Sequence, residues 1–291
     1  MKIVTFTENH RTRLGVLRED GVVDLATHAP QLPHTMISFL RMGPAAMEEA
    51  RAAADKAAST IPLARCQLLA PVPRPTKVLA IGLNYADHVR EGNRALPEHQ
   101  VWFAKQPTSI IGPGAPIVIP SVSEMIDFEG ELAYVIGRRA RKVPKERAHE
   151  VIAGFMIGND ISVRDWQQRS PTMMMGKGFD THGPIGPWLV TPDEVGDFQN
   201  LTIRTWVNGS LMQNGSTAEM IFGIREQIEH LSAAFTLEPG DVIFTGTPAG
   251  VGVARKPPVF LKPGDVVRIE IDQLGALENP CIADTVESFI V

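Results

Sequence analysis

The chain has 291 residues and a formal net charge of -5, and 44% of its residues are hydrophobic and 21% charged. These values favour a folded protein with one large or two modest domains and argue against a disordered chain. The basic residues form no long run, so we expect no nucleic-acid partner. The two distant cysteines indicate thiols in a reducing compartment. Because neither a secretion signal nor an apolar run of about 18 residues is evident, we expect a cytoplasmic protein without a membrane partner.

The N-terminal part predicts a mixture of strands and helices. Apolar and polar positions alternate over residues 2–25, and the break at residues 19–21 is typical of a hairpin. Residues 35–41 and 44–58 predict two helices, with Pro44 near the start of the second. This part contains no clustered chemistry, so we interpret it as a small accessory domain.

A proline-rich connector follows the accessory domain. Residues 71–75 contain three prolines, which stiffen the chain and favour an extended conformation. We therefore place a domain boundary here, with the accessory domain over residues 1–72 and the main domain over residues 73–291.

The first candidate catalytic pair comes soon after the connector. Residues 77–82 predict a short buried strand, and we expect Asn84 to cap the helix that follows. His88 and Glu91 are three residues apart on this helix, so they would share a face. A histidine held by a carboxylate suits a general base. Taken alone, the pair also fits an exposed helix with one histidine and one glutamate.

Carboxylates recur at every second position in residues 127–132, which lead into an apolar strand. Because side chains on a strand alternate between two faces, Glu129 and Glu131 would share a face, with Asp127 behind them. Carboxylates on one face repel each other unless a cation lies among them, and hard oxygen ligands indicate Mg²⁺, Mn²⁺ or Ca²⁺. A solvent-facing acidic edge strand is the alternative.

More polar residues follow the next predicted strand. Residues 151–158 predict a buried strand that presents Asp160 at its end, where binding sites are commonly built. We expect Ser162 to cap a short helix that carries Arg164. Lys177 stands between two glycines and points either into a cleft or into a turn.

A glycine-rich loop over residues 245–252 follows the predicted strand at 241–244. The loop lacks the Gly-Lys-Ser/Thr ending of a phosphate-binding loop, and Pro248 interrupts it, so nucleotide binding is not predicted. Its backbone amides better suit a small carboxylate. Upstream, Asn208-Gly209 predicts a tight hairpin turn and residues 222–235 predict a helix.

Taken together, these stretches resemble one family. The motifs are residues 82–91 (Gly-Leu-Asn-Tyr-Ala-Asp-His-Val-Arg-Glu), 128–131 (Phe-Glu-Gly-Glu), 158–165 (Gly-Asn-Asp-Ile-Ser-Val-Arg-Asp), 176–180, 207–210 and 245–252. In their order and spacing they resemble the fumarylacetoacetate hydrolase family, in its two-domain bacterial branch. The resemblance covers about residues 70–291. It implies a β-rich α+β fold, a mixed β-sheet roll with a small N-terminal α+β domain.

The resemblance also implies a metal site. It places one Mg²⁺ or Mn²⁺ ion per subunit on Glu129, Glu131 and Asp160, and leaves Asp127 behind these ligands or on the surface. The family's partners would be a small 2-oxo acid substrate and a second copy of the chain in a homodimer.

The resemblance assigns further roles by position. The catalytic residues would be His88, Glu91 and Lys177. The substrate-binding positions would fall on Arg164, Gln167, Lys177 and Thr247. Gln168 lies beside Gln167 and competes with it for that assignment.

These residues suit hydrolysis of a C–C bond in an acylpyruvate-type 2,4-dioxo acid, with His88 activating water and pyruvate leaving. The alternative on the same site is an oxaloacetate keto–enol tautomerase or decarboxylase, or an isomerase or hydratase of 2-oxo acids from aromatic degradation. A non-catalytic protein that binds a metal or a small acid is a further alternative, although it needs no base. We expect residues 91–101 and 168–175 to set substrate specificity.

Overall fold

The computed structural model describes residues 1–288 and 290. The strands are β1 Lys2–Glu8, β2 Arg11–Arg18, β3 Gly21–Asp24, β4 Gln67–Leu68, β5 Val78–Gly82, β6 Val101–Lys105, β7 Ile110–Ile111, β8 Ile117–Ile119, β9 Ile126–Asp127, β10 Gly130–Ile136, β11 Ile152–Asn159, β12 Ser162–Val163, β13 Gly183–Val190, β14 Thr202–Val207, β15 Ser210–Ser216, β16 Val242–Phe244, β17 Val266–Ile271 and β18 Gly275–Ala283. The α-helices are α1 Leu25–His28, α2 Met36–Arg41, α3 Pro44–Lys56, α4 Ala86–Glu91, α5 Arg164–Gln167, α6 Met174–Lys177, α7 Pro192–Val195 and α8 Ile224–Ala234. The 3₁₀ helices are η1 Leu63–Arg65, η2 Pro107–Ser109, η3 Lys145–Val151, η4 Thr217–Glu219 and η5 Gly252–Ala254. None of the helices formed by the described residues has both the length and the apolar character needed to cross a membrane.

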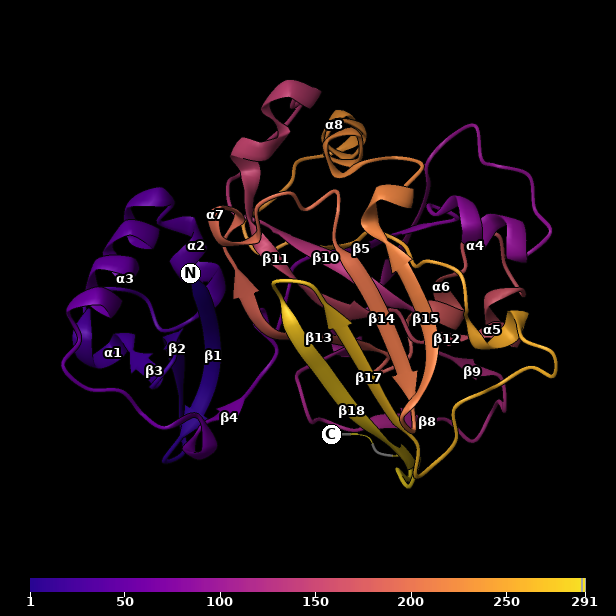
Figure 1. Ribbon diagram of the computed structural model, residues 1–291, viewed down its shortest axis with the longest axis horizontal. Coiled ribbons are helices and arrows are strands. Elements are labelled where there is room, and N and C mark those ends of the chain that lie inside the picture. The colour runs from indigo at the N-terminus through magenta and orange to yellow at the C-terminus, as the bar shows by residue number, and fades with distance from the viewer. Residues whose placement is uncertain (289, 291) are drawn as a thin grey trace.

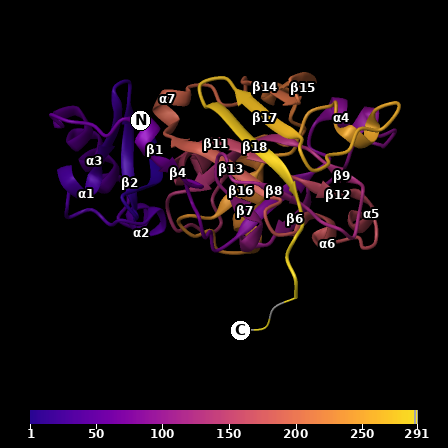
Figure 2. The same cartoon turned by 90° about the horizontal axis from the view of Figure 1, so that it is seen from below.

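The fold is β-rich and α+β, as the sequence predicted. Within the described residues, an eleven-stranded sheet has the order β3-β2-β1-β13-β11-β10-β16-β5-β6, with β4 beside β1 and β7 beside β13. A five-stranded sheet has the order β15-β14-β17-β18-β8, and β12 pairs with β9. Figures 1 and 2 show the smaller sheet layered over the middle of the larger one.

The N-terminal part contributes strands to the large sheet. The predicted hairpin is confirmed as β2 and β3, and the two predicted helices are confirmed as α2 and α3. Strand β1 pairs with β13, where Lys2 lies opposite Val190. Backbone pairing therefore continues from the N-terminal part into the rest of the molecule. The boundary after residue 72 stays a prediction.

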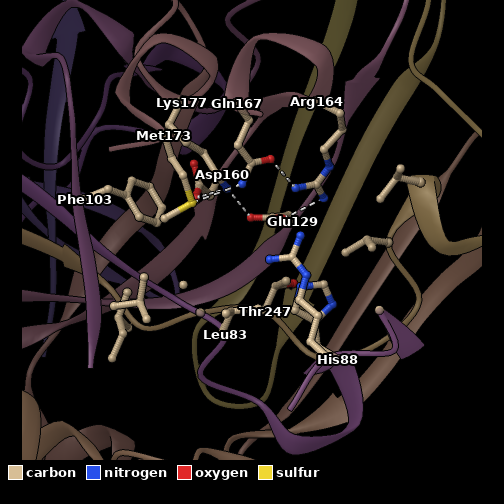
Figure 3. A pocket seen from close by; sticks show the side chains of 18 of the residues that line it. Leu83, His88, Phe103, Glu129, Asp160, Arg164, Gln167, Met173, Lys177 and Thr247 are labelled. Carbon is tan, nitrogen blue, oxygen red and sulfur yellow. Dashed lines mark hydrogen bonds and ion pairs between the residues drawn. The ribbon is translucent and has the colours of Figure 1, made fainter. Parts of the chain in front are cut away.

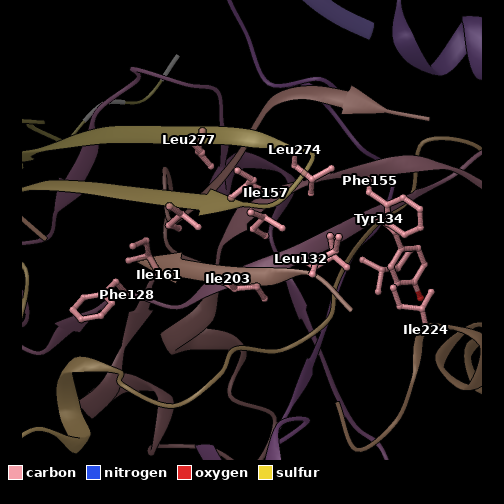
Figure 4. Close-up of a cluster of buried hydrophobic side chains, with 14 of the residues drawn as sticks. Phe128, Leu132, Tyr134, Phe155, Ile157, Ile161, Ile203, Ile224, Leu274 and Leu277 are labelled. Atoms are coloured by element: carbon pink, nitrogen blue, oxygen red, sulfur yellow. The ribbon is translucent and has the colours of Figure 1, made fainter. Parts of the chain in front are cut away.

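The alternation of side chains along β10 assigns its two faces to two cores. Leu132 and Tyr134 belong to the cluster between the two large sheets, which Figure 4 shows. Ala133 and Val135 belong to the cluster shared with the N-terminal part. Both faces of this central strand are buried, which explains its nearly continuous apolar sequence. Glu131 comes two residues before Ala133, so its side chain points to the same face of β10 as Ala133 and Val135.

Two predicted helix caps are wrong. The residue before α4 is Tyr85, and the Asn84 side chain instead donates hydrogen bonds to the backbone oxygens of Phe222 and Thr245. The residue before α5 is Val163, while the Ser162 hydroxyl donates to a backbone oxygen two residues earlier. Asn84 thus bonds to backbone oxygens far away in the chain, whereas Ser162 bonds to a local one, and each of these bonds outcompetes the predicted capping bond. Asn84 consequently ties the loop before α4 to the end of β16.

Candidate active site and metal centre

The three predicted metal ligands lie together at one end of the large sheet. Glu129 and Glu131 flank the start of β10, and Asp160 directly follows β11. These strands are antiparallel neighbours in which Glu131 lies opposite Gly158, so the start of one meets the end of the other. Ligand oxygens of the three carboxylates all lie within 4.8 Å of one another, and all three residues are buried. The spacing therefore reflects the register of two paired strands.

Two basic side chains compensate part of this negative charge. Arg164 Nη2 lies 2.7 Å from Glu129 Oε1. Lys177 Nζ lies 2.6 Å from Glu129 Oε2 and 2.6 Å from Asp160 Oδ2. Burial alone would raise the pKa of Glu129, but Lys177 and Arg164 outweigh it and hold that pKa below its usual range. Glu129 is therefore a carboxylate at neutral pH.

Glu131 is compensated least. In the described part of the chain it has no ion pair, and its carboxylate accepts a hydrogen bond of 2.7 Å from the Gly246 backbone N–H. Burial, Asp160 and Glu129 together raise the pKa of Glu131 well above its usual range. A cation among the three carboxylates would remove this unfavourable charge. Three clustered carboxylates offer hard oxygen donors, so the residues fit a divalent ion such as Mg²⁺ or Mn²⁺.

The sequence did not point to Lys105, which contacts the predicted metal ligand Asp160. Its ammonium group is fully buried and lies 2.6 Å from Asp160 Oδ1 and 2.5 Å from the backbone oxygen of Lys177. Burial lowers the pKa of Lys105, while Asp160 opposes that shift. One signal was present, because alternation along β6 places Lys105 on the same face as the buried Phe103.

Asp127 lies outside the triad, as expected, but it is fully buried. One carboxylate oxygen accepts the Nε–H of Arg164 at 2.8 Å. The two oxygens also accept backbone N–H groups from Gly252 at 2.7 Å and Val253 at 3.0 Å. Asp127 thus orients the guanidinium that contacts Glu129 and anchors the glycine-rich loop.

The predicted catalytic pair is in contact. His88 Nδ1 lies 2.7 Å from Glu91 Oε1, and Glu91 Oε2 accepts the N–H of Gly250 at 2.8 Å. A carboxylate can only accept, so Nδ1 donates this hydrogen bond, and in the neutral imidazole the lone pair is on Nε2. Asp87 adds a second tie, because it accepts the N–H of Ala249 at 3.1 Å. The loop amides expected to meet a small carboxylate thus meet carboxylates of the protein itself.

A cavity of about 410 Å³ joins the two clusters. Figure 3 shows Arg164, Gln167 and Lys177 on one side of the cavity and His88 on the opposite side. The predicted site residues that line it are His88, Glu91, Glu129, Glu131, Asp160, Arg164, Gln167, Lys177 and Thr247. Gln168 lines it as well, so position does not separate the two glutamines. Both segments expected to set specificity contribute lining residues.

The predicted substrate contacts Gln167 and Thr247, like Arg164 and Lys177, already have protein partners. Gln167 Oε1 accepts from Arg164 Nη1 at 3.0 Å. The Thr247 hydroxyl donates to the Gly130 backbone oxygen at 2.9 Å and accepts from Gln213 Nε2 at 2.7 Å. The single hydroxyl proton of Thr247 is used in this way, so Thr247 could only accept a hydrogen bond from a substrate. Its roles toward substrate, like those of the other site residues, stay predictions.

The fold and the site define a class of β-rich α+β enzymes with a buried carboxylate centre beside a histidine–carboxylate pair. The family model described as the C-terminal part of fumarylacetoacetate (FAA) hydrolase matches residues 77–282. The chain belongs to the fumarylacetoacetate hydrolase family. A non-catalytic binding protein is therefore set aside.

Curated relatives match nearly the whole chain. The oxaloacetate tautomerase fahd2, mitochondrial, of Xenopus laevis is 44% identical over 288 residues, which cover 97% of this chain and 90% of the relative. The oxaloacetate tautomerase FAHD2A, mitochondrial, of Homo sapiens is 43% identical, with 97% and 92% covered. These names favour the alternative prediction, tautomerisation, over acylpyruvate hydrolysis. The predicted cytoplasmic location is corrected, because these relatives are named mitochondrial.

Solved structures agree with the fold. Fumarylacetoacetate hydrolase from psychrophilic Exiguobacterium antarcticum is 36% identical with a TM-score of 0.85, and 98% of this chain and all of that chain are covered. Maleylpyruvate hydrolase from Sphingobium sp. SYK-6, in complex with manganese (II) ion and pyruvate, is 32% identical with a TM-score of 0.82, and 97% and 99% are covered. A protein with a similar fold thus binds Mn²⁺, which agrees with the carboxylate centre found here.

Proposed function

We propose that the protein catalyses keto–enol tautomerisation of oxaloacetate with the help of Mg²⁺ or Mn²⁺. The observation that carries this proposal is the contact between His88 and Glu91 at the cavity that also contains the three buried carboxylates. The names of the 43–44% identical relatives support the choice of reaction and of substrate.

The carboxylates Glu129, Glu131 and Asp160 would hold the metal ion. When bound, the ion would supply positive charge to the carboxylate and keto oxygens of a 2-oxo acid. Arg164 and Lys177 line the same part of the cavity and add positive charge. Substrate binding is therefore favoured for an anion, although the protein as a whole is acidic.

The proton moves through His88. Its Nε2 would take a proton from C3 of the keto acid or return one to C3 of the enol, while the oxygen at C2 gains or loses a proton in balance. Glu91 keeps Nδ1 protonated and stabilises the imidazolium that forms. No water attack is needed, and no C–C bond breaks.

Hydrolysis of an acylpyruvate is the second candidate, and one observation favours it. The side chains of Val101, Phe103 and Met173 form an apolar part of the cavity wall. Oxaloacetate has no apolar group to contact this wall, whereas an acyl group would. In that reaction His88 would activate a water molecule instead of moving a proton at C3.

Three separate signals distinguish these reactions. The Mg²⁺-loaded protein is mixed with the enol of oxaloacetate, and the enol absorbance, CO₂ and pyruvate are followed independently; a 2,4-dioxo acid is tested in parallel. We expect faster loss of the enol signal, no matching CO₂ and little pyruvate from the dioxo acid, and chelator should abolish the effect. Pyruvate release from the dioxo acid without enol loss would select hydrolysis. The predicted homodimer is tested on the same preparation by light scattering.

A further inference from the structure

One basic side chain that lines the cavity is not paired with an acid in the described part of the chain. Among the described residues, the basic side chains that line it are His88, Arg94, Arg164 and Lys177. Arg164 and Lys177 are committed to Glu129 and neighbouring acids at 2.6–2.8 Å. His88 is committed to Glu91 through Nδ1. Arg94 differs from all of them, because in the described part of the chain its guanidinium forms no ion pair and donates no side-chain hydrogen bond.

The backbone around Arg94 is fixed. The N–H of Arg94 donates to the Val89 oxygen at 3.1 Å, and the N–H of Asn93 donates to the Arg90 oxygen at 3.0 Å. Asn93 itself has a left-handed conformation with φ of 51°. This pair of bonds around a left-handed residue is a Schellman motif, which ends α4 and turns the chain back. Arg94 is exposed and lies in the loop that follows α4, but its backbone is held at a defined point six residues after His88.

The position of Arg94 suits the far end of a ligand. Arg164, Gln167 and Lys177 lie across the cavity from His88 in Figure 3, and Arg94 is attached to the helix that carries His88. A 2-oxo acid whose carboxylate and keto oxygens lie at the carboxylate centre would extend its other end toward α4. A second carboxylate there would meet Glu91 and repel it unless a cation intervened. Guanidinium groups match carboxylates in shape and charge and often bind them with two hydrogen bonds.

We propose that Arg94 binds the distal carboxylate of the ligand and makes the site selective for 2-oxo dicarboxylic acids over 2-oxo monocarboxylic acids. The inference rests on the proposed function in one respect: the 2-oxo acid end of the ligand must lie at Glu129, Glu131 and Asp160. It goes further in assigning specificity to one side chain. It also gives a physical reason for the expectation that residues 91–101 set specificity.

The test uses two acids of equal length that differ in one group. Binding of 2-oxoglutarate and of 2-oxopentanoate to the Mg²⁺-loaded protein is measured by calorimetry, for the wild type, Arg94→Met, Arg94→Lys and Arg90→Met. Arg90 is the matched control, because it is exposed like Arg94, lies on α4 four residues earlier and does not line the cavity. Turnover is not followed, so the result is independent of whether the protein is a tautomerase.

We expect Arg94→Met to weaken 2-oxoglutarate binding about tenfold or more, as loss of a charge-assisted hydrogen bond does, and to change 2-oxopentanoate binding less than about threefold. Arg94→Lys should restore part of the affinity, and Arg90→Met should match the wild type. Equal losses for both acids, no loss in Arg94→Met, or a wild type that binds neither acid or both equally would overturn the proposal. If selectivity is found and the enol assay is negative, the proposed reaction fails and the role of Arg94 stands.

Discussion

Lys105 and Asp160 form a buried ion pair in which Nζ lies 2.6 Å from Oδ1. Lys177 contacts the other carboxylate oxygen at 2.6 Å, so the proposed metal ligand Asp160 is held from two sides. We expect Lys105→Gln and Lys105→Met to lower metal affinity about 10- to 100-fold, because a ligand that loses its supporting partner loses its orientation. Titration calorimetry with Mn²⁺ measures this change.

An ion pair between a partly exposed lysine and a buried aspartate provides the control for Lys105. Lys77 Nζ lies 2.8 Å from the buried Asp241, and neither residue lines the cavity. Lys77→Met should cost folding stability, as Lys105→Met does, but leave Mn²⁺ affinity unchanged. Unchanged Mn²⁺ affinity in a folded Lys105 variant would show that Asp160 needs no support.

The pair His88 and Glu91 should govern rate and not metal binding. We expect His88→Ala to slow enol loss by on the order of 10²–10⁴-fold, because the base is removed, while Mn²⁺ affinity stays within about twofold. Glu91→Gln should slow it by about tenfold or more, since the amide cannot stabilise the imidazolium. Stopped-flow absorbance gives the rates. The exposed His99 offers a control, and a His88→Ala variant as fast as His99→Ala would make the base assignment wrong.

Glu131 should be required for metal binding and dispensable for folding. Its raised pKa indicates that its charge is unfavourable in the metal-free protein. Glu131→Gln should therefore leave the metal-free melting temperature equal or higher, and Glu131→Ala should abolish turnover. The wild type should gain melting temperature with Mg²⁺ and the variants should not, because only binding to the native state stabilises. Differential scanning calorimetry with and without the ion decides, and a variant that still melts higher with Mg²⁺ contradicts the ligand assignment.

His182 predicts a dependence of stability on pH. Its side chain is fully buried, and Nε2 donates to the Val118 oxygen at 2.9 Å. Burial lowers the pKa of His182 from its usual 6.5 to about 4, with smaller effects from Val118, Lys105 and Asp180. Between these values the unfolded state binds more protons, so this stability is present above pH 6.5 and is lost as the pH falls toward 4.

The size of the loss follows from the shift in the pKa of His182. It amounts to roughly 3 kcal/mol of unfolding free energy between pH 7 and pH 4. His182→Gln keeps a donor for Val118 but does not titrate, so its unfolding free energy should fall less steeply over this range. Urea unfolding at several pH values compares the two proteins, and parallel curves would argue against a buried neutral histidine.

Local sequence patterns predicted the parts of the site that lie close together in the chain. Glu129 and Glu131 follow the period of a strand, and His88 and Glu91 follow the period of a helix, so each pair is visible without the fold. Asp160 was predicted as a site residue because it follows a predicted strand, where binding sites are commonly built. The family resemblance then indicated that these stretches form one site. The spacing of residues within each stretch does not show this.

The supporting contacts could not be predicted in the same way. Lys105 is 55 residues from Asp160, and Asp127 is 125 residues from Gly252. A lysine on a strand usually faces water, and the burial of Lys105 depends on charges that other segments bring to it. The capping prediction for Asn84 failed for a related reason, since its side chain donates to backbone oxygens that folding brings to it. The prediction for Ser162 failed locally, since its hydroxyl donates to the backbone oxygen of Asp160.

The pairing of β1 with β13 couples the accessory part to the enzyme. A chain cut near residue 72 would leave the backbone groups of β13 exposed along an edge and would uncover the apolar face that Ala133 and Val135 share with the N-terminal part. Such a fragment would be prone to aggregation, and its catalytic centre would be built on a weakened sheet. We therefore expect the whole chain to fold as one cooperative unit, so that mutations far from the cavity, in the first strand, reduce the amount of active enzyme without changing its chemistry.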